Sequence, residues 1–158
     1  MDYEVVLVEE KTVVGLEVST TNEDNRAMAD IGMLWGEFLQ AGVYDAISNK
    51  INAKGIGLYT DYEGDFTKPY KFLACCEVSE VNSLATKMVV KKIPRGYYAK
   101  FIVKGHMQHA VGEFWSNLWG LSLDRKYSSD FEEYQNNSND MENQEIHIYI
   151  ALMINERA

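Results

Sequence analysis

The order in which helical and strand-like segments recur constrains the fold of this chain most. The helical stretches 31–35 (IGMLW) and 111–115 (VGEFW) both carry a glycine at the second position and a tryptophan at the fifth, and they lie 80 residues apart. Two strand-like stretches precede each of them and two follow. The pattern predicts two tandem ββαββ repeats, residues 1–80 and 84–158, related by a pseudo-twofold axis. Because the matched stretch is short, chance similarity is the alternative.

Two such repeats can pair into one antiparallel sheet of about eight strands with two main helices, which is an α+β fold. β-branched residues predict strands, and apolar residues three and four apart predict helices. The clearest expected strands are 3–8, 12–19, 55–62, 70–78, 86–92, 97–103 and 145–152, and the expected helices are 25–41, 107–119 and a short one within 43–53. The polar link Glu9-Glu10-Lys11 predicts a hairpin, and Ile93-Pro94-Arg95-Gly96 predicts a turn between two paired strands.

The apolar residues of the first expected helix should share one face. They are Met28, Ile31, Leu34, Trp35, Phe38 and Leu39. Their spacing of three and four residues is typical of a helix that packs on a core. Gly42 then follows as a plausible end of the helix.

The bulk composition limits the partners of the chain. Its 158 residues fit a single domain, 1–158, that needs no disulfide to hold a core. With 15 Lys and Arg against 24 Asp and Glu, the net charge is −9. This acidity argues against direct binding to nucleic acid or to an anionic membrane and suits a cationic ligand, unless it only aids solubility. No apolar stretch approaches the roughly 20 residues of a membrane helix, and the N-terminus has no signal-peptide pattern.

The residues that usually carry metal or catalytic chemistry form no such pattern here. Cys75 and Cys76 are adjacent and would point to opposite faces of a strand, which predicts reduced thiols and a cytoplasmic location. His106 and His109 lie three apart, but no further ligand stands at a suitable spacing. Motifs for nucleotide binding and acyl transfer are missing from the sequence. We therefore expect no metal, no cofactor, no catalytic residue and no enzyme activity.

Seven short segments, spread over nearly the whole chain, match a known family in order and spacing. They are 3–6 (YEVV), 13–15 (VVG), 57–62 (GLYTDY), 93–99 (IPRGYYA) with Phe101, 115–119 (WSNLW), 130–134 (DFEEY) and the last strand. Each is weak alone, but together they resemble the GyrI-like, AraC-type effector-binding family. They are also similar to its integron-associated subgroup of single domains. The resemblance implies the fold described above and a pocket for small, often cationic, molecules.

The last strand departs from the pattern of this family. In the family, a glutamate on that strand precedes an apolar, aromatic, apolar and proline sequence and meets the positive charge of the ligand. Laid on 148–152 (IYIAL), the glutamate position is His147 and the proline position is Ala151. Glu145 lies two residues earlier and shares a strand face with His147 and Tyr149, so it is a candidate to replace the family acid.

An aromatic pocket with one carboxylate would suit a cation, because ring faces and a carboxylate both attract positive charge. The expected ligand-binding residues are Trp35, Tyr59, Trp115, Trp119, Glu145, His147 and Tyr149. We expect one cavity between the two repeats that contacts Trp115 or Trp119 together with His147 or Tyr149. The alternatives are ordinary core packing of each tryptophan and a solvent-facing surface on the last strand.

The sequence thus predicts a stand-alone protein that binds amphipathic organic molecules, cationic or neutral. A link to transcription regulation or to multidrug response would have to act through another protein. One alternative is a modulator that binds a protein partner, as the gyrase-inhibitor member of the family does. The other is a small hydrolase of reactive ligands, with His147 as base and Glu145 as its orienting group. The sequence does not determine the oligomeric state.

Overall fold

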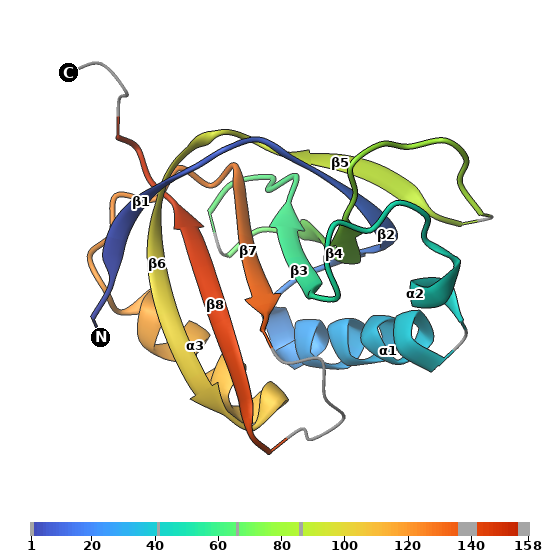
Figure 1. Ribbon diagram of the computed structural model, residues 1–158. Helices are drawn as coiled ribbons and strands as arrows, with labels where there is room; N and C mark the ends of the chain where they lie inside the picture. Colours follow the sequence, from blue (N-terminus) through green and yellow to red (C-terminus); the bar gives the residue numbers. More distant parts are fainter. Residues whose placement is uncertain (1, 41, 66, 86, 136–141, 155–158) are drawn as a thin grey trace.

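The computed structural model describes residues 2–40, 42–65, 67–85, 87–135 and 142–154 (Figure 1). The strands are β1 (Glu4–Val8), β2 (Lys11–Thr20), β3 (Gly55–Thr60), β4 (Tyr70–Glu77), β5 (Val89–Ile93), β6 (Gly96–Gly105), β7 (Ser129–Tyr134) and β8 (Gln144–Ala151). The helices are a 3-10 turn η1 (Glu23–Asn25), α1 (Arg26–Gln40), the short α2 (Val43–Ala46) and α3 (Met107–Trp119). No helix in these ranges is long and apolar enough to cross a membrane.

The eight strands form one antiparallel sheet in the order β1-β6-β8-β7-β3-β4-β2-β5. The predicted α+β class, the single sheet and the two main helices are confirmed. Exchanging β1 with β5, β2 with β6, β3 with β7 and β4 with β8 gives the same strand order, read from the opposite edge of the sheet. This is the arrangement that two ββαββ repeats require, and the superposition of the two halves stays a prediction.

The two hairpins expected from the links at 9–11 and 93–96 are wrong. β1 pairs with β6, and β2 pairs with β4 and β5, so neither link connects neighbouring strands. Instead, one register continues from the first strand pair into the second. Val8 of β1 pairs with Gly96 of β6, and Lys11 of β2 then pairs with Ile93 of β5. Glu9 and Glu10 offer neither Gly nor Asn for a two-residue hairpin turn, so the chain runs on as one long, bent strand.

This continuous ladder curls the sheet. β1 stands at one edge and β5 at the other, and the two long strands that contain them cross over the top of the sheet (Figure 1). Figure 1 shows α1 and α3 beneath the same side of the sheet, which we call the helix face. The opposite side, the second face, has an apolar cluster that includes Leu58, Leu73 and Phe131, each 0% exposed. Since the long helices cover only the helix face, the curl of the sheet itself buries this cluster.

The helix face holds the larger apolar cluster, into which α1 sends Trp35 and Phe38. Only part of the expected apolar face of this helix is buried. Ile31 and Leu34 pack against the cluster, whereas Met28 is 73% and Leu39 is 56% exposed. The reason is geometric: residues 28 and 39 lie at the margins of the apolar stripe, and the curved sheet meets only its centre.

Candidate functional site

The sheet divides the seven residues predicted to bind ligand into two groups. Trp35, Tyr59 and Trp115 lie together on the helix face. The ring centroids of Tyr59 and Trp115 are 4.9 Å apart. Trp119, at the end of α3, is 39% exposed and does not belong to the buried part of this cluster.

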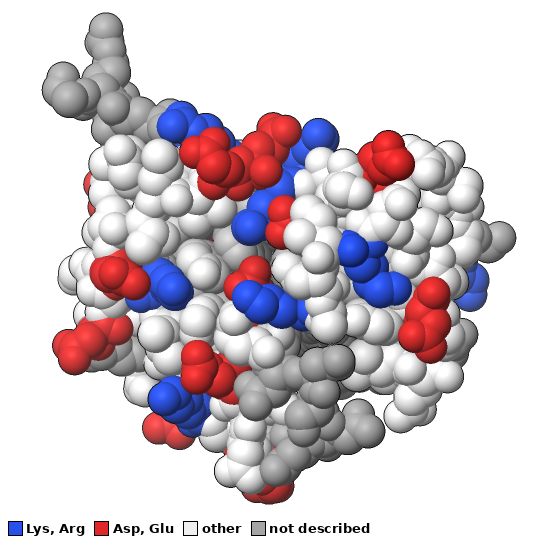
Figure 2. Space-filling model, viewed as in Figure 1, with Lys and Arg blue, Asp and Glu red and all other residues white. Residues whose placement is uncertain are grey.

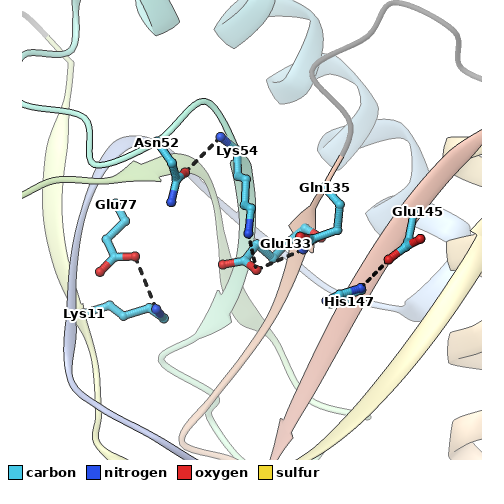
Figure 3. A network of polar contacts seen from close by, with 8 residues as sticks. All are labelled: Lys11, Asn52, Lys54, Glu77, Glu133, Gln135, Glu145 and His147. Carbon is cyan, nitrogen blue, oxygen red and sulfur yellow. Dashed lines mark hydrogen bonds and ion pairs between the residues drawn. The ribbon is translucent and has the colours of Figure 1, made fainter.

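Glu145, His147 and Tyr149 lie on the second face, as Figure 3 shows for the first two. Ile146, Ile148 and Ile150 of β8 all enter the cluster on the helix face, so strand alternation turns the residues between them the other way. The predicted single cavity that unites Trp115 or Trp119 with His147 or Tyr149 is therefore wrong. Two cavities of about 280 and 440 Å³ lie at the β5–β6 corner and beside α3, and neither is lined by any of the seven residues.

The polar residues of the second face largely compensate one another. The Nε2 atom of His147 lies 2.7 Å from a carboxylate oxygen of Glu145, and this contact lowers the pKa of Glu145. The Lys54 ammonium lies 3.6 Å from Glu133, which also accepts a hydrogen bond from Gln135 (Figure 3). Figure 2 shows acidic and basic groups interspersed over the visible surface rather than gathered by sign. The described residues hold no group of three or more His, Cys, Asp or Glu that could bind a metal.

The helix face holds a carboxyl group that the sequence analysis missed, that of Glu132 on β7. Its side chain is 1% exposed and lies on the same side of the sheet as Trp35 and Tyr59. The Tyr134 hydroxyl donates a hydrogen bond of 2.9 Å to one oxygen, and the Tyr59 hydroxyl donates one of 3.2 Å to the other. In the described parts of the chain, no Lys, Arg or His forms an ion pair with it.

Aromatic rings enclose this carboxyl group, so we call the site the Glu132 cage. The cage is formed by Trp35, Tyr59, Phe72, Trp115 and Tyr134. Trp35 comes from α1 and Trp115 from α3, at corresponding positions of the two repeated helical stretches. The strands of the sheet supply the floor, and one tryptophan from each main helix supplies a wall.

The surroundings of Glu132 place the pKa of its carboxyl group near neutral pH. Burial raises the pKa of Glu132 to about 7, while the hydroxyl groups of Tyr134 and Tyr59 favour the ionised form and limit the rise. The Trp115 indole N–H also lowers this pKa, although its geometry does not meet the criteria for a hydrogen bond. It has no hydrogen-bond partner among the described residues. Burial and the neighbouring Glu132 together raise the pKa of Tyr59 well above its usual value, so this phenol stays a proton donor.

Two further features distinguish the surroundings of Glu132 from an ordinary apolar core. Gly57 on β3 faces Glu132 across the strand pair, and a Cβ atom there would lie 2.7 Å from a carboxylate oxygen. Glycine at this position therefore makes room for the carboxyl group. The indole N–H groups of Trp35 and Trp115 are both buried, and neither has a hydrogen-bond partner among the residues that the structure describes. Unpaired buried donors are uncommon in a core that serves only packing.

A signal for Glu132 was present in the sequence. Segment 130–134 alternates, so that Asp130, Glu132 and Tyr134 share one strand face while Phe131 and Glu133 share the other. This segment is one of those that resemble the effector-binding family, but the sequence analysis placed the candidate acid, Glu145, on the last strand. Laying β7 beside the aromatic face of β3 would have identified Glu132 as the buried carboxyl group.

A curled antiparallel sheet covered by two helices on one face is the fold of a class of effector-binding proteins. Residues 4–152 match the model of the integron-associated effector binding protein family, and the chain belongs to that family. An integron cassette protein from the mobile metagenome of Vibrio cholerae shares 30% identity with it. Their structures give a TM-score of 0.76 over 94% of each chain.

Two solved structures with lower identity share the fold. SAV2435, solved bound to tetraphenylphosphonium, is 21% identical, with a TM-score of 0.77 over 96% of this chain and 93% of that one. A transcription regulation protein from Staphylococcus aureus MU50 is 19% identical, with a TM-score of 0.75 over 96% of this chain and 97% of that one. No curated protein sequence matches the chain.

Proposed function

We propose that this protein binds an amphipathic organic cation in the Glu132 cage. The observation that carries the proposal is a carboxyl group that is 1% exposed, ringed by aromatic side chains and not ion-paired with any described residue. An ionised carboxylate in such surroundings is costly unless it acquires a partner. A ligand cation supplies the missing charge, and its apolar groups gain from contact with the rings.

Aromatic rings and a carboxylate favour a bulky, weakly hydrated cation over an inorganic ion. Each ring contact with a cation contributes roughly 0.5–2 kcal/mol, depending on how fully water is excluded. Apolar area on the ligand adds about 25 cal/mol per Å² buried. A small metal ion gains little from either contribution and loses its hydration shell. The site therefore suits onium compounds with apolar substituents.

The cage must open before it can hold a ligand. Glu132 is almost fully buried, and neither of the two cavities described above reaches it. Trp115 is only half-buried and lies at the margin of the cage, so rotation of this side chain is the shortest route in. A ligand that binds only the open form shifts the population towards it, and its apparent affinity falls with the fraction of open molecules.

The relatives support this assignment in two ways. The chain belongs to a family of effector-binding proteins. In addition, SAV2435 binds tetraphenylphosphonium, which is an organic monocation with four aromatic rings. We extend the proposal to a non-enzymatic role in the cytoplasm, in which the occupied protein acts through another protein on transcription or drug response. Glu145, His147 and Tyr149 lie outside the cage in this proposal.

A titration with tetraphenylphosphonium tests the proposal, with neutral triphenylphosphine oxide as the uncharged probe. Glu132→Gln should weaken binding of the cation at least tenfold and leave binding of the neutral probe nearly unchanged. The matched control is Glu133→Gln, the next residue, whose carboxylate lies on the second face. It should leave both affinities within twofold of the parent. Equal cation binding by the parent and Glu132→Gln would overturn the assignment.

The pH dependence gives a second readout of the same titration. Because the pKa of Glu132 is about 7, only about a tenth of the carboxyl groups are ionised at pH 6. Cation affinity of the parent should therefore fall about tenfold between pH 8 and pH 6, and binding at pH 6 should release a proton. In Glu132→Gln this dependence should disappear.

A further inference from the structure

A second buried carboxylate lies one step along β7 from the cage. Asp130 and Glu132 are two residues apart, so they share the helix face at a separation of roughly 7 Å along the strand. The Asp130 side chain is 0% exposed. Unlike Glu132, Asp130 is already ion-paired, because the Nη2 atom of Arg125 lies 2.7 Å from its Oδ2 atom. The Arg125 side chain is itself 6% exposed, so the pair is buried as a unit.

Both carboxylate oxygens of Asp130 accept further hydrogen bonds. Its Oδ1 atom accepts a 2.8 Å hydrogen bond from the Ala151 backbone N–H, and its Oδ2 atom accepts one of 2.5 Å from the Tyr62 hydroxyl. Burial and the nearby Asp130 raise the pKa of Tyr62 well above its usual value, so the phenol stays protonated. Arg125 and these donors thus compensate the Asp130 carboxylate within the protein.

The Arg125 guanidinium lies against the same aromatic system that encloses Glu132. Its Cζ atom is 4.2 Å from the ring centroid of Tyr127 and 5.7 Å from that of Trp115. Trp115 in turn contacts Tyr59, which donates to Glu132. One tryptophan therefore lies between a cation that belongs to the protein and the carboxyl group we assign to a ligand. The Nε atom of Arg125 is buried and has no hydrogen-bond partner in the described part of the chain. Charge pairing and ring contact, rather than a full set of hydrogen bonds, therefore hold the group in place.

We propose that Arg125 is a specificity-determining residue that limits the site to one positive ligand charge. The inference rests on the proposed function of Glu132. Of the two buried carboxylates on this face of β7, Arg125 neutralises one and leaves the other for the ligand. A dication that placed one charge at Glu132 would have to bury its second charge beside the Arg125–Asp130 pair, where Asp130 is already neutralised and cannot compensate it, and an uncompensated buried charge is costly. The protein therefore selects monocations.

The test compares two flat aromatic cations of similar shape, 1-methyl-4-phenylpyridinium, with one charge, and 1,1′-dimethyl-4,4′-bipyridinium, with two at opposite ends. The parent should bind the monocation at least tenfold more tightly. Arg125→Met keeps the length of the side chain and removes the charge, so it should move the ratio of the two affinities at least tenfold towards the dication. Arg125→Met with Asp130→Asn should restore a preference for the monocation, and Arg125→Lys should retain the parent ratio.

The design separates a selectivity role from a purely structural one. Removing one partner of a buried ion pair destabilises a protein, so each variant is first checked by circular dichroism. If Arg125→Met does not fold, Asp130→Asn takes its place. That variant leaves Arg125 uncompensated and should weaken the dication at least fivefold more than the monocation. A folded variant whose affinity ratio equals that of the parent would overturn the role of Arg125.

The proposed function is tested alongside with Glu132→Gln, which should lose both cations. If Glu132→Gln binds both cations as the parent does, the proposed function fails. If Glu132→Gln loses them while Arg125→Met keeps the parent ratio, only the inference about Arg125 fails.

Discussion

Glu132 and Glu133 are neighbours in the chain, yet the alternation of a strand places their carboxyl groups on opposite faces of the sheet. Glu133 is 9% exposed and lies 3.6 Å from the ammonium of Lys54 on the second face (Figure 3). Among the described residues, the polar and aromatic neighbours of the Glu132 carboxyl group are two tyrosine hydroxyl groups, an indole N–H and ring faces. Two identical side chains thus differ in chemistry because of the neighbours that each face supplies.

The first prediction concerns the stability cost of Glu132. The pKa of its carboxyl group is about 7 in the folded protein and 4.5 in an exposed reference state. Since the folded-state pKa is the higher one, the stabilising contribution of the protonated group is fully present below about pH 4.5. It is lost as pH rises through about 7. Between pH 5.5 and 8.5, the parent should lose roughly 2 kcal/mol more unfolding free energy than Glu132→Gln does.

Urea unfolding at the two pH values, followed by tryptophan fluorescence, measures this difference. Effects of other titrating groups cancel in the comparison, because both proteins share them. Glu133→Gln is the control, because Glu133 is also largely buried but lies beside Lys54 on the opposite face, and its pH profile should follow that of the parent within about 0.5 kcal/mol, the usual limit of additivity for independent sites. Parallel pH profiles for the parent and Glu132→Gln would show that the carboxyl group is not desolvated as the geometry requires.

At the scale of elements, α3 presents two tryptophans one turn apart to different surroundings. Trp115 is half-buried, contacts Tyr59 and Phe114, and forms a wall of the cage. Trp119 lies at the end of the helix and is 39% exposed. Their spacing of four residues places both on the same side of the helix, but Trp115 packs against Tyr59 of the sheet while Trp119 stays largely exposed.

The second prediction follows from this difference. Trp115→Ala should weaken tetraphenylphosphonium binding about twofold to thirtyfold, the range that corresponds to one cation–ring contact of roughly 0.5–2 kcal/mol. Trp119→Ala should change the affinity less than twofold. Isothermal titration calorimetry at pH 8, where Glu132 is mostly ionised, measures both affinities. A larger loss of affinity in Trp119→Ala than in Trp115→Ala would place the ligand on the exposed end of α3.

At the scale of the whole molecule, the two halves depend on each other for their strand partners. β1 of the first half pairs only with β6 of the second, and β5 of the second pairs only with β2 of the first. In addition, β3 and β7 join the halves at the centre of the sheet. Neither half can complete its own hydrogen-bonded ladders, so folding requires contacts that are distant in sequence.

The third prediction tests this dependence with two fragments, residues 1–83 and 84–158. Each fragment alone should lack a cooperative thermal transition as a monomer, because unpaired strand edges and half a core do not offset the entropy of ordering the chain. A mixture of the two should form a 1:1 complex with a cooperative transition. Circular dichroism and analytical ultracentrifugation measure both properties. A fragment that folded cooperatively as a monomer would contradict the interdependence seen in the sheet.

Local pattern in the sequence was enough to predict most elements and the fold class. The spacing of Trp35 and Phe38 predicted α1, and the alternation of Ile146, Ile148 and Ile150 predicted which face of β8 enters the core. The repeated element order predicted a single sheet of eight strands. These features depend on neighbours within one element, so the sequence contains them directly.

Long-range pairing decided what local pattern could not. Two links that looked like turns are bends in long strands, because the partner of β1 is β6 and not β2. The candidate site changed for the same reason. His147 and Tyr149 were grouped with the tryptophans from the composition of the last strand, but β8 turns them away from α1 and α3. Which acid becomes the buried one depends on the elements packed over it.

The sequence by itself therefore determined the elements, their faces and the presence of aromatic and acidic groups suited to a cation. Only the tertiary structure decided that Glu132 is the acid the tryptophans enclose and that Arg125 neutralises its neighbour Asp130. The physical reason is that burial of a charge is a property of its surroundings. Those surroundings come from β3, α1 and α3, which are separated in the chain and meet only when the curled sheet brings them together.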